Sequence, residues 1–341
     1  MVQQRQPVDR TVRSMDQMEH RLVGTTGVEV SRLILGCGNF GGIGSAPVFF
    51  GRGTSKDDAF ALMDAAWEAG ITTFDTADAY GGGNSETFIG EWLAHKDASV
   101  RDRITLTTKT YNPMAQGADS GLSRDRMVRQ IDTSLGRLGV DRVALYLAHE
   151  FDSAVPIEQT MAGFDDIVQA GKVAAVGASN FSADQLQRSL DASTQCGVVR
   201  YSWVQNSFSL LERKDAHDVV PLCSEQQLGY SPFSPLAGGW LTGKYRRGAT
   251  PPVGSRMTLR PEPYAPYLAD GVFDALEALE RLAAEHRTSM AAMSLGWLLE
   301  QPGITAVVIG PNRVAQMTPA LEALQLTLSP DVLADLSELF S

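Results

Sequence analysis

Eight short apolar segments recur along the chain, and each is followed by a stretch with helical spacing. The repeat is roughly 30–35 residues long, as expected for successive strand–helix units. The predicted strands centre near residues 34, 73, 106, 145, 175, 204, 231 and 307. They are mostly apolar along their length, which is typical of strands buried on both faces of a parallel sheet. Eight such units predict an α/β fold with a closed (β/α)8 TIM barrel, rather than an open doubly wound sheet.

Local signals place several helix ends. The helix after the first strand is predicted to end at Gly70, which suits a left-handed C-terminal residue. Ser85 is predicted as the N-cap of the next helix. Pro156 suits the first turn of the helix after the fourth strand, because proline lacks the N–H that this position leaves unpaired.

Two segments do not belong to the repeat. Residues 20–32 predict a β-hairpin with Thr26 and Gly27 in its turn, placed to plug the N-terminal end of the barrel. Residues 237–271 form a long segment rich in proline and glycine, which follows the seventh strand and so is expected at the C-terminal rim of the barrel. We expect residues 1–18 to be a polar, mobile tail and residues 19–341 to form one domain.

The composition excludes several classes of partner. The net charge of -11 and the absence of a basic cluster argue against general nucleic-acid binding. No window approaches the roughly 20 apolar residues of a membrane span. The cysteines are odd in number and widely spaced, without a zinc or disulfide pattern: Cys37, Cys196 and Cys223. A reducing, cytoplasmic location is therefore expected.

Three successive predicted strands end in ionisable residues. Asp75 ends one strand, Lys109 the next and His149 the one after, and Tyr80 lies in the loop just past Asp75. Neighbouring strands of a parallel barrel bring such ends to one rim, where active sites of this fold lie. Each residue alone has an ordinary interpretation, such as a turn carboxylate or a core histidine, so their joint placement carries the argument.

These side chains suit proton transfer to a carbonyl oxygen. Asp75 and Lys109, on adjacent strands, are expected to form a buried ion pair. Tyr80 is then expected to fold back over that pair, where the ammonium of Lys109 would lower the tyrosine pKa. His149 adds a donor or a second proton carrier.

Protein side chains do not donate hydride, so a reduction at this site needs a cofactor. The sequence contains neither a serine nucleophile elbow nor a metal-ligand cluster. The turn after the last strand, with Gly310 and Arg313 before a predicted helix, is a candidate phosphate site. No GxGxxG motif opens a strand–helix unit, which disfavours cofactor binding of the Rossmann type.

Several ordered motifs resemble one family. The segments HRLVGTTGVEVSRLILGCGNFGG, FDTADAYGGGNSE, TKT, LYLAHEFD, VGASNFS, SPLAGGWLTGKY and GPNRVAQM occur in that order. Over roughly residues 19–325 the chain resembles the aldo-keto reductases, particularly their longer bacterial branch. The resemblance implies a catalytic tetrad of Asp75, Tyr80, Lys109 and His149. In it, Tyr80 is the general acid of reduction and the base of oxidation, Lys109 and Asp75 tune it, and His149 orients the carbonyl.

The resemblance also implies NADPH as the cofactor, with NADH as the alternative, bound extended across the rim. Ser179, Asn180 and Gln205 would bind the carboxamide, and Phe233 would stack on the nicotinamide ring. The backbone near Cys37 and Gly38 would also approach the cofactor, and Asp75 would be a further cofactor-binding position. Ser234, Leu236, Lys244 and Arg256 would hold the pyrophosphate, and Gly310, Asn312, Arg313 and Gln316 would surround the adenosine 2′-phosphate.

The chain departs from the family pattern at several positions. Glu150 stands where arginine is common, and Phe233 where tyrosine or tryptophan is frequent. Pro319 and Ala320 replace a usual Glu and Asn, which removes expected adenine contacts and weakens a preference for NADP over NAD. The loop 39–54 is longer than usual, and it either shapes the substrate pocket or is simply a packed loop.

The resemblance favours an NADP(H)-dependent oxidoreductase that reversibly reduces an aldehyde or ketone to an alcohol. Its partner would be a small carbonyl or alcohol substrate, chosen by the rim loops 39–54, 111–122 and 237–271. One alternative is an NADP(H)-binding regulatory protein with little turnover. Another is a sugar-modifying enzyme that uses transient oxidation.

Overall fold

The computed structural model of the chain describes residues 18–340. Apart from Met18, the predicted tail therefore lies outside the described residues. The central sheet has eight strands, all pairing in parallel in the order β10-β3-β4-β5-β6-β7-β8-β9. The strands are β3 (Leu33–Gly36), β4 (Thr73–Asp75), β5 (Thr105–Thr110), β6 (Val143–Ala148), β7 (Val173–Ser179), β8 (Trp203–Gln205), β9 (Gly229–Tyr230) and β10 (Val307–Ile309).

Backbone hydrogen bonds join the two ends of this sheet. The N–H of Thr305 donates to the carbonyl of Tyr230 at 2.8 Å, and the N–H of Val308 donates to that of Pro232 at 2.9 Å. The sheet therefore closes between its two edge strands, β9 and β10, and the predicted (β/α)8 barrel is confirmed. Seven predicted strand centres fall within a strand, and the eighth, at residue 231, lies one residue past β9.

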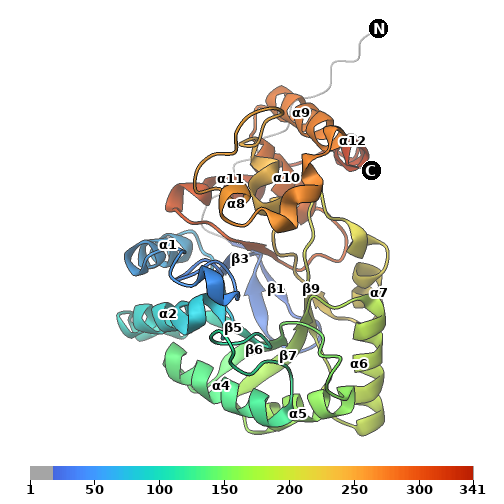
Figure 1. Ribbon diagram of the computed structural model, residues 1–341. Helices are drawn as coiled ribbons and strands as arrows, with labels where there is room; N and C mark the ends of the chain where they lie inside the picture. The colour runs from blue at the N-terminus through green and yellow to red at the C-terminus, as the bar shows by residue number, and fades with distance from the viewer. Residues whose placement is uncertain (1–17, 341) are drawn as a thin grey trace.

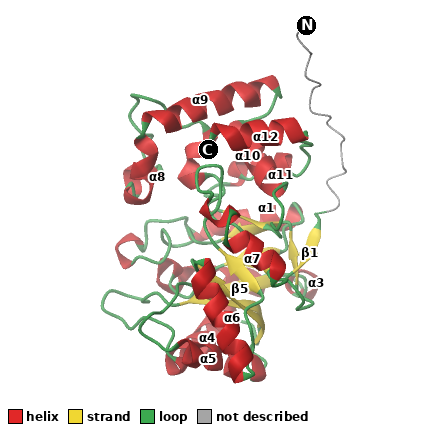
Figure 2. Cartoon of the chain, turned by 90° about the vertical axis from the view of Figure 1, so that its right-hand side faces the viewer, coloured by secondary structure: helices red, strands yellow, loops and turns green. Residues whose placement is uncertain are grey.

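Helices surround the barrel (Figure 1). The helices α9 to α12 gather on one side of it and α4 to α6 on the opposite side, as both views show (Figure 2). The helices are α1 (Lys56–Glu68), α2 (Asn84–Ala94), α3 (Ala98–Arg101), α4 (Arg124–Leu138), α5 (Ile157–Gln169), α6 (Ala183–Cys196), α7 (Val219–Glu225), α8 (Arg256–Leu259), α9 (Asp270–Glu285), α10 (Met290–Leu299), α11 (Thr318–Ala323) and α12 (Pro330–Leu339).

The hairpin of β1 (His20–Leu22) and β2 (Glu29–Ser31) has the predicted turn, closed by a hydrogen bond from the N–H of Val23 to the carbonyl of Val28. Val23 and Val30 are fully buried and join a cluster of apolar side chains from the barrel interior. The N–H of Ser31 donates to the hydroxyl of Thr73, the first residue of β4. The hairpin therefore covers the N-terminal end of the barrel.

The local helix signals had mixed outcomes. Gly70 follows α1 with φ +80°, as expected of a left-handed terminator. The prediction for Ser85 is wrong: α2 begins at Asn84 after a left-handed Gly83. The hydroxyl of Ser85 instead donates to the carbonyl of Cys37 at 2.9 Å, which ties α2 to the end of β3. Pro156 is the N-cap of α5, just before its first turn.

Candidate active site

The structure brings the four predicted residues together at the C-terminal rim. Asp75 is the last residue of β4, Lys109 the penultimate residue of β5, and His149 follows the last residue of β6. Tyr80 begins the 3-10 turn η2 (Tyr80–Gly83), close after β4. Three neighbouring strands therefore deliver their ionisable ends to one place, because parallel strands share a direction.

Asp75 and Lys109 form a buried ion pair. The ammonium of Lys109 donates to Oδ2 of Asp75 at 2.6 Å and to the carbonyl of Thr76 at 2.9 Å. Oδ1 of Asp75 accepts from the hydroxyl of Thr107 at 2.5 Å and from the amide of Gln205 at 3.0 Å. Both charged side chains are almost fully buried, so these hydrogen bonds replace the water that each has lost.

Tyr80 lies over this pair, as expected. The Nζ atom of Lys109 is 5.2 Å from the centre of the Tyr80 ring, and the Tyr80 hydroxyl is 3.4 Å from Nε2 of His149. The expected fall in the tyrosine pKa does not occur. Burial raises the pKa of Tyr80, and although the charge of Lys109 opposes this, the net direction is upward. The hydroxyl therefore keeps its proton at neutral pH, as a proton donor must.

The charge states of the other two groups follow from their surroundings. Burial lowers the pKa of Lys109, but Asp75 and Tyr80 raise it, and the net pKa is raised, so the lysine is a cation. Burial and the charge of Lys109 both lower the pKa of His149, well below its usual value. The imidazole is therefore neutral. Its Nδ1 atom is buried without a partner, whereas Nε2 faces Tyr80.

The alternation of β5 explains which polar residues reach the site. Successive side chains of a strand point to opposite faces. Thr107 and Lys109 face the barrel interior, where both contact Asp75. Thr108 and Thr110 face outward, toward the helices.

A cleft of about 530 Å³ opens beside Asp75 and Tyr80 and continues across the rim to the end of β10. Its volume is in the range of small-molecule sites. The predicted long segment after the seventh strand contributes much of its wall. The cleft is lined by most of the predicted cofactor residues, namely Gly38, Asp75, Gln205, Phe233, Ser234, Leu236, Lys244, Arg256, Gly310, Asn312 and Gln316.

Four predicted cofactor residues do not line this cleft: Cys37, Ser179, Asn180 and Arg313. The Cys37 side chain is fully buried, and its thiol points to the carbonyl of Leu35. Asn180 donates to the carbonyl of His149 at 2.9 Å and lies 3.2 Å from the hydroxyl of Ser179. Arg313 is exposed. A 3-10 helix, η6 (Val314–Gln316), follows it directly, and the α-helix α11 begins at Thr318.

One end of the cleft is positively charged. Lys244 and Arg256 both line it, and burial and the nearby charge of Arg256 lower the pKa of Lys244. Gly239, with φ +94°, lies directly beneath the lysine, because a Cβ atom there would come within 2.1 Å of Nζ of Lys244. Arg256 also donates to the side chain of Asn39 across the cleft. Within residues 18–340 neither cation has a carboxylate partner, and two such cations on one concave surface suit a phosphate-bearing ligand.

Sequence reasoning missed several cleft residues. Asn39, Tyr264 and Ser289 come from three distant segments and line the cleft together. No regular spacing in the sequence links these three residues. The one available signal is the glycine pair 238 and 239, because Gly238 packs against the ring of Tyr264. Pro319 and Ala320, which replace the usual Glu and Asn of the family pattern, also line the cleft.

Fold and site together define a class: a (β/α)8 barrel with a protonated tyrosine, a lysine–aspartate ion pair and a neutral histidine beside a cationic cleft. Residues 32–340 match the model of the Aldo/keto reductase family. The chain therefore belongs to the aldo/keto reductase family and is an oxidoreductase. Within residues 18–340, no helix has the length and apolar character needed to cross a membrane, and no three metal-ligating side chains gather into a site.

Curated relatives match along nearly their full length. An uncharacterized oxidoreductase, YrpG, of Bacillus subtilis is 33% identical over 95% of this chain and 96% of its own. The L-glyceraldehyde 3-phosphate reductase of Escherichia coli K12 is 31% identical over 94% of this chain and 92% of its own. A probable voltage-gated potassium channel subunit beta of Oryza sativa is 30% identical over 92% and 94%.

Proposed function

We propose that this protein is an NADP(H)-dependent carbonyl reductase, which converts an aldehyde or ketone to an alcohol and also runs in reverse. The observation that carries the proposal is the position of the Tyr80 hydroxyl. It lies at the cleft wall, 3.4 Å from Nε2 of His149, above the cation of Lys109. A carbonyl oxygen that entered between Tyr80 and His149 would meet two hydrogen-bond donors at once.

Each residue of the tetrad has a separate role in the transfer of one proton. In reduction, Tyr80 donates its hydroxyl proton to the oxygen that develops negative charge. The Lys109 ammonium stabilises the phenolate that remains, and the carboxylate of Asp75 holds that ammonium at 2.6 Å. His149 is neutral because of its burial, so it can donate from Nε2 and orient the carbonyl without adding a charge. In oxidation, Tyr80 acts as the base.

The cleft is the proposed site of an extended dinucleotide. Gln205, whose amide bonds to Asp75, and Phe233 line the cleft and would hold the reactive ring, and Lys244 and Arg256 would supply cations for the pyrophosphate. A nicotinamide cofactor, when bound, supplies the hydride that no side chain can give. Asn312 and Gln316, which line the cleft, and the exposed Arg313 are proposed for the 2′-phosphate of NADPH. NADH remains the alternative cofactor.

The proposed substrate is a small carbonyl compound, chosen by the rim loops. In the loop 39–54, the Phe50 ring lies against Gly82, two residues past Tyr80, and the guanidinium of Arg260 lies 5.7 Å from the centre of the Phe49 ring. These contacts support the interpretation of this loop as a wall of the substrate site. A cytoplasmic location stays a prediction from the cysteine pattern, and all three cysteines are free.

The test is turnover on a carbonyl panel, with aromatic aldehydes, ketones and short hydroxyaldehydes, followed by the loss of NADPH absorbance. Tyr80→Phe keeps the ring and removes the proton, so it should abolish most turnover while its NADPH affinity, measured by fluorescence titration, stays unchanged. A parallel NADH series measures the cofactor preference. Tight NADPH binding with no turnover on any carbonyl would overturn the proposal.

A second candidate is a cofactor-binding regulatory protein, favoured by the likeness to a probable channel subunit from rice. It predicts NADPH binding, negligible turnover and a stable partner in a pull-down. Mass spectrometry of the products from the same panel also separates net reduction from the dehydration or epimerisation of a sugar-modifying enzyme.

A further inference from the structure

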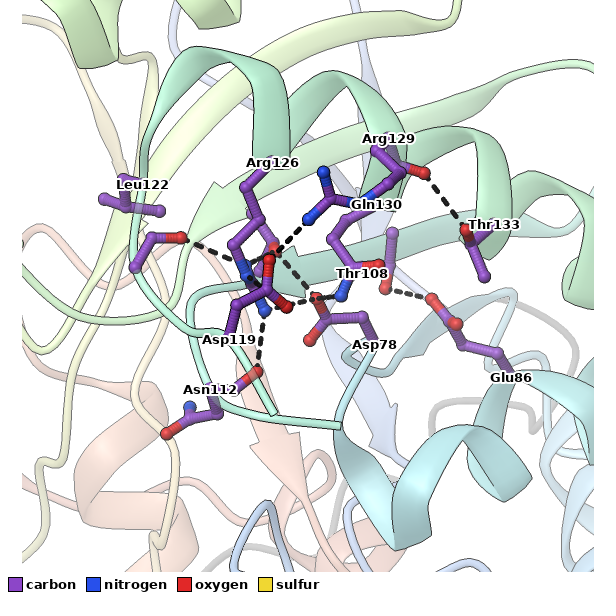
Figure 3. Close-up of polar contacts among 12 residues, drawn as sticks. Asp78, Glu86, Thr108, Asn112, Asp119, Leu122, Arg126, Arg129, Gln130 and Thr133 are labelled. Atoms are coloured by element: carbon purple, nitrogen blue, oxygen red, sulfur yellow. Dashed lines mark hydrogen bonds and ion pairs between the residues drawn. The ribbon is translucent and has the colours of Figure 1, made fainter. Parts of the chain in front are cut away.

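A second polar cluster lies behind the catalytic site, on the outer face of β5 (Figure 3). We call Asp78, Thr110, Arg126 and Gln130 the outer cluster. Oδ2 of Asp78 accepts from the Thr110 hydroxyl at 2.7 Å and from the amide of Gln130 at 3.3 Å. The guanidinium of Arg126 donates to the hydroxyl oxygen of Thr110 at 2.8 Å. All four side chains are more than nine-tenths buried, and none lines the cleft.

Thr110 connects this cluster to two catalytic residues. It directly follows Lys109 in β5, and its carbonyl accepts the backbone N–H of His149 at 2.9 Å. The backbone N–H of Asp78 in turn donates to the carbonyl of Lys109 at 2.9 Å. A movement of Thr110 would therefore displace the backbone on which Lys109 and His149 are mounted.

Asp78 connects the cluster to the Tyr80 turn, which we define as residues 76–83. Asp78 lies two residues before Tyr80. On the far side of the turn, Gly81 packs directly on Gly42 of the loop 39–54, because a Cβ atom at Gly42 would come within 2.6 Å of the Cα atom of Gly81. The turn is therefore held between that loop and the outer cluster, and Asp78 is its polar anchor.

Arg126 extends the same connection to a rim loop. From α4, it donates to the carbonyl of Asn112 at 2.8 Å and to that of Gly121 at 3.0 Å. These residues lie near the two ends of the loop 111–122. Figure 3 shows Arg126 between this loop and Asp78. One guanidinium thus bonds to the loop expected to meet the substrate and, through Thr110, to the Tyr80 turn.

We infer that Asp78, Thr110 and Arg126 are positioning residues that fix the Tyr80 hydroxyl relative to Lys109 and His149. The inference rests on the proposed function and adds residues that touch neither the substrate nor the cofactor. Its physical basis is the steep dependence of proton transfer on geometry, since a misplacement of about 1 Å can cost about 100-fold in rate.

The electrostatics of Asp78 agree with a positioning role. Burial raises the pKa of Asp78 to about 7; the Thr110 hydroxyl and the charge of Arg126 lower it, and the charge of Glu86 raises it. Tyr146 of β6 is a further ionisable neighbour. A carboxyl group that holds its proton near neutral pH is matched by an asparagine, which keeps both the shape and the acceptor oxygen.

The matched test uses two threonines of β5 that face outward. Thr110→Val removes the hydroxyl that joins Asp78 to Arg126. Thr108→Val is the control, because its hydroxyl bonds instead to Glu86 of α2 at 2.7 Å. Valine keeps the branched shape that strands favour. We expect Thr110→Val to lower kcat by about 10- to 100-fold and to leave the Kd for NADPH unchanged. We expect Thr108→Val to keep kcat within about threefold of the wild type, although it lowers the midpoint of urea unfolding by about as much as Thr110→Val does.

Asp78 provides a second pair, in case Thr110→Val folds poorly. Asp78→Asn should keep most of kcat, whereas Asp78→Leu should lose it as Thr110→Val does. The inference is overturned if Thr110→Val and Asp78→Leu keep full kcat. It is also overturned if Thr108→Val loses as much kcat as Thr110→Val, because stability alone would then explain the loss.

A measurement without turnover separates this inference from the proposed function. In protein labelled with carbon-13 at the tyrosine ζ-carbon, the Tyr80 signal is assigned by its loss in Tyr80→Phe. We expect this signal to shift in Thr110→Val and to stay in place in Thr108→Val. If the wild-type protein reduces no carbonyl, the proposed function fails, while an unchanged Tyr80 signal in Thr110→Val would still reject the positioning role.

Discussion

Asp75 and Asp78 are three residues apart and both buried, yet they belong to two different networks. The carboxylate of Asp75 faces the barrel interior and has three donors: Lys109, Thr107 and Gln205. Asp78 faces the opposite way, toward α4. Its nearest cation, on Arg126, is 3.9 Å away, and its Oδ1 atom has no partner.

The difference arises because the two faces of strand β5 contribute side chains to two separate networks. Because side chains of β5 alternate, Thr107 and Lys109 face the inner network and Thr110 faces the outer one. Thr108 also faces outward but bonds separately, to Glu86 of α2. The inner network meets the cleft and contains a full ion pair. The outer network is closed to the cleft, and burial raises the pKa of Asp78 to about 7. The fold therefore pairs the Asp75 carboxylate directly with a cation, whereas burial disfavours the charge of Asp78.

The largest expected effect comes from breaking the inner network at its cation. Lys109→Met leaves the buried carboxylate of Asp75 without an opposite charge and removes the cation below Tyr80. We expect carbonyl reduction to fall by about 100- to 10,000-fold and the free energy of unfolding to fall by about 3–5 kcal/mol. Steady-state kinetics and urea unfolding measure the two effects. A variant that is as active as the wild type would remove Lys109 from the mechanism.

The two aspartates can be compared directly by the same substitution. Asp75→Asn leaves the Lys109 ammonium buried without its carboxylate, and we expect it to cost about 3–5 kcal/mol of unfolding free energy. Asp78→Asn removes no full charge pair, so we expect a cost within about 1.5 kcal/mol. Guanidinium-chloride unfolding of both variants provides the comparison. Equal losses would show that Asp78 carries a charge that the outer network needs.

The pH dependence of activity should reflect the raised pKa of Tyr80. Reduction needs the protonated hydroxyl, which a raised pKa preserves, so we expect its rate to hold through neutral pH and to fall only on the alkaline side. Oxidation needs the phenolate, and its rate should rise with pH over the same range. Initial rates in both directions across a buffer series test this. A reduction rate that declines from pH 6 to 8 would contradict the assignment.

The last prediction concerns the pH dependence of stability at the outer carboxyl of Asp78. The folded pKa of Asp78, about 7, lies above its usual value of 3.8. The folded state therefore holds a proton that the unfolded state releases between these values. This contribution to stability is complete below pH 3.8 and is lost as the pH rises through 7. The difference in unfolding free energy between the wild type and Asp78→Asn should change across this window, and a constant difference would mean that Asp78 stays ionised.

The eight strands and most of the rim were predictable, because they depend on local patterns. Apolar runs at a regular spacing located the strands, and the ionisable residues at three strand ends located Asp75, Lys109 and His149. The resemblance to the reductases added Tyr80 and most of the cleft residues. The N-cap prediction for Ser85 failed, because a run of left-handed glycines before α2 decides where that helix begins.

The sequence by itself determined the barrel, the identity of the four catalytic candidates and the chemistry they can perform. The tertiary structure alone decided the direction of the Tyr80 pKa, because the cost of burial depends on everything packed around the ring. It also decided that Asn39, Tyr264 and Ser289 share the cleft and that Asp78 faces Arg126 rather than Lys109. Those facts depend on which distant surfaces meet, and a linear pattern of residues does not contain them.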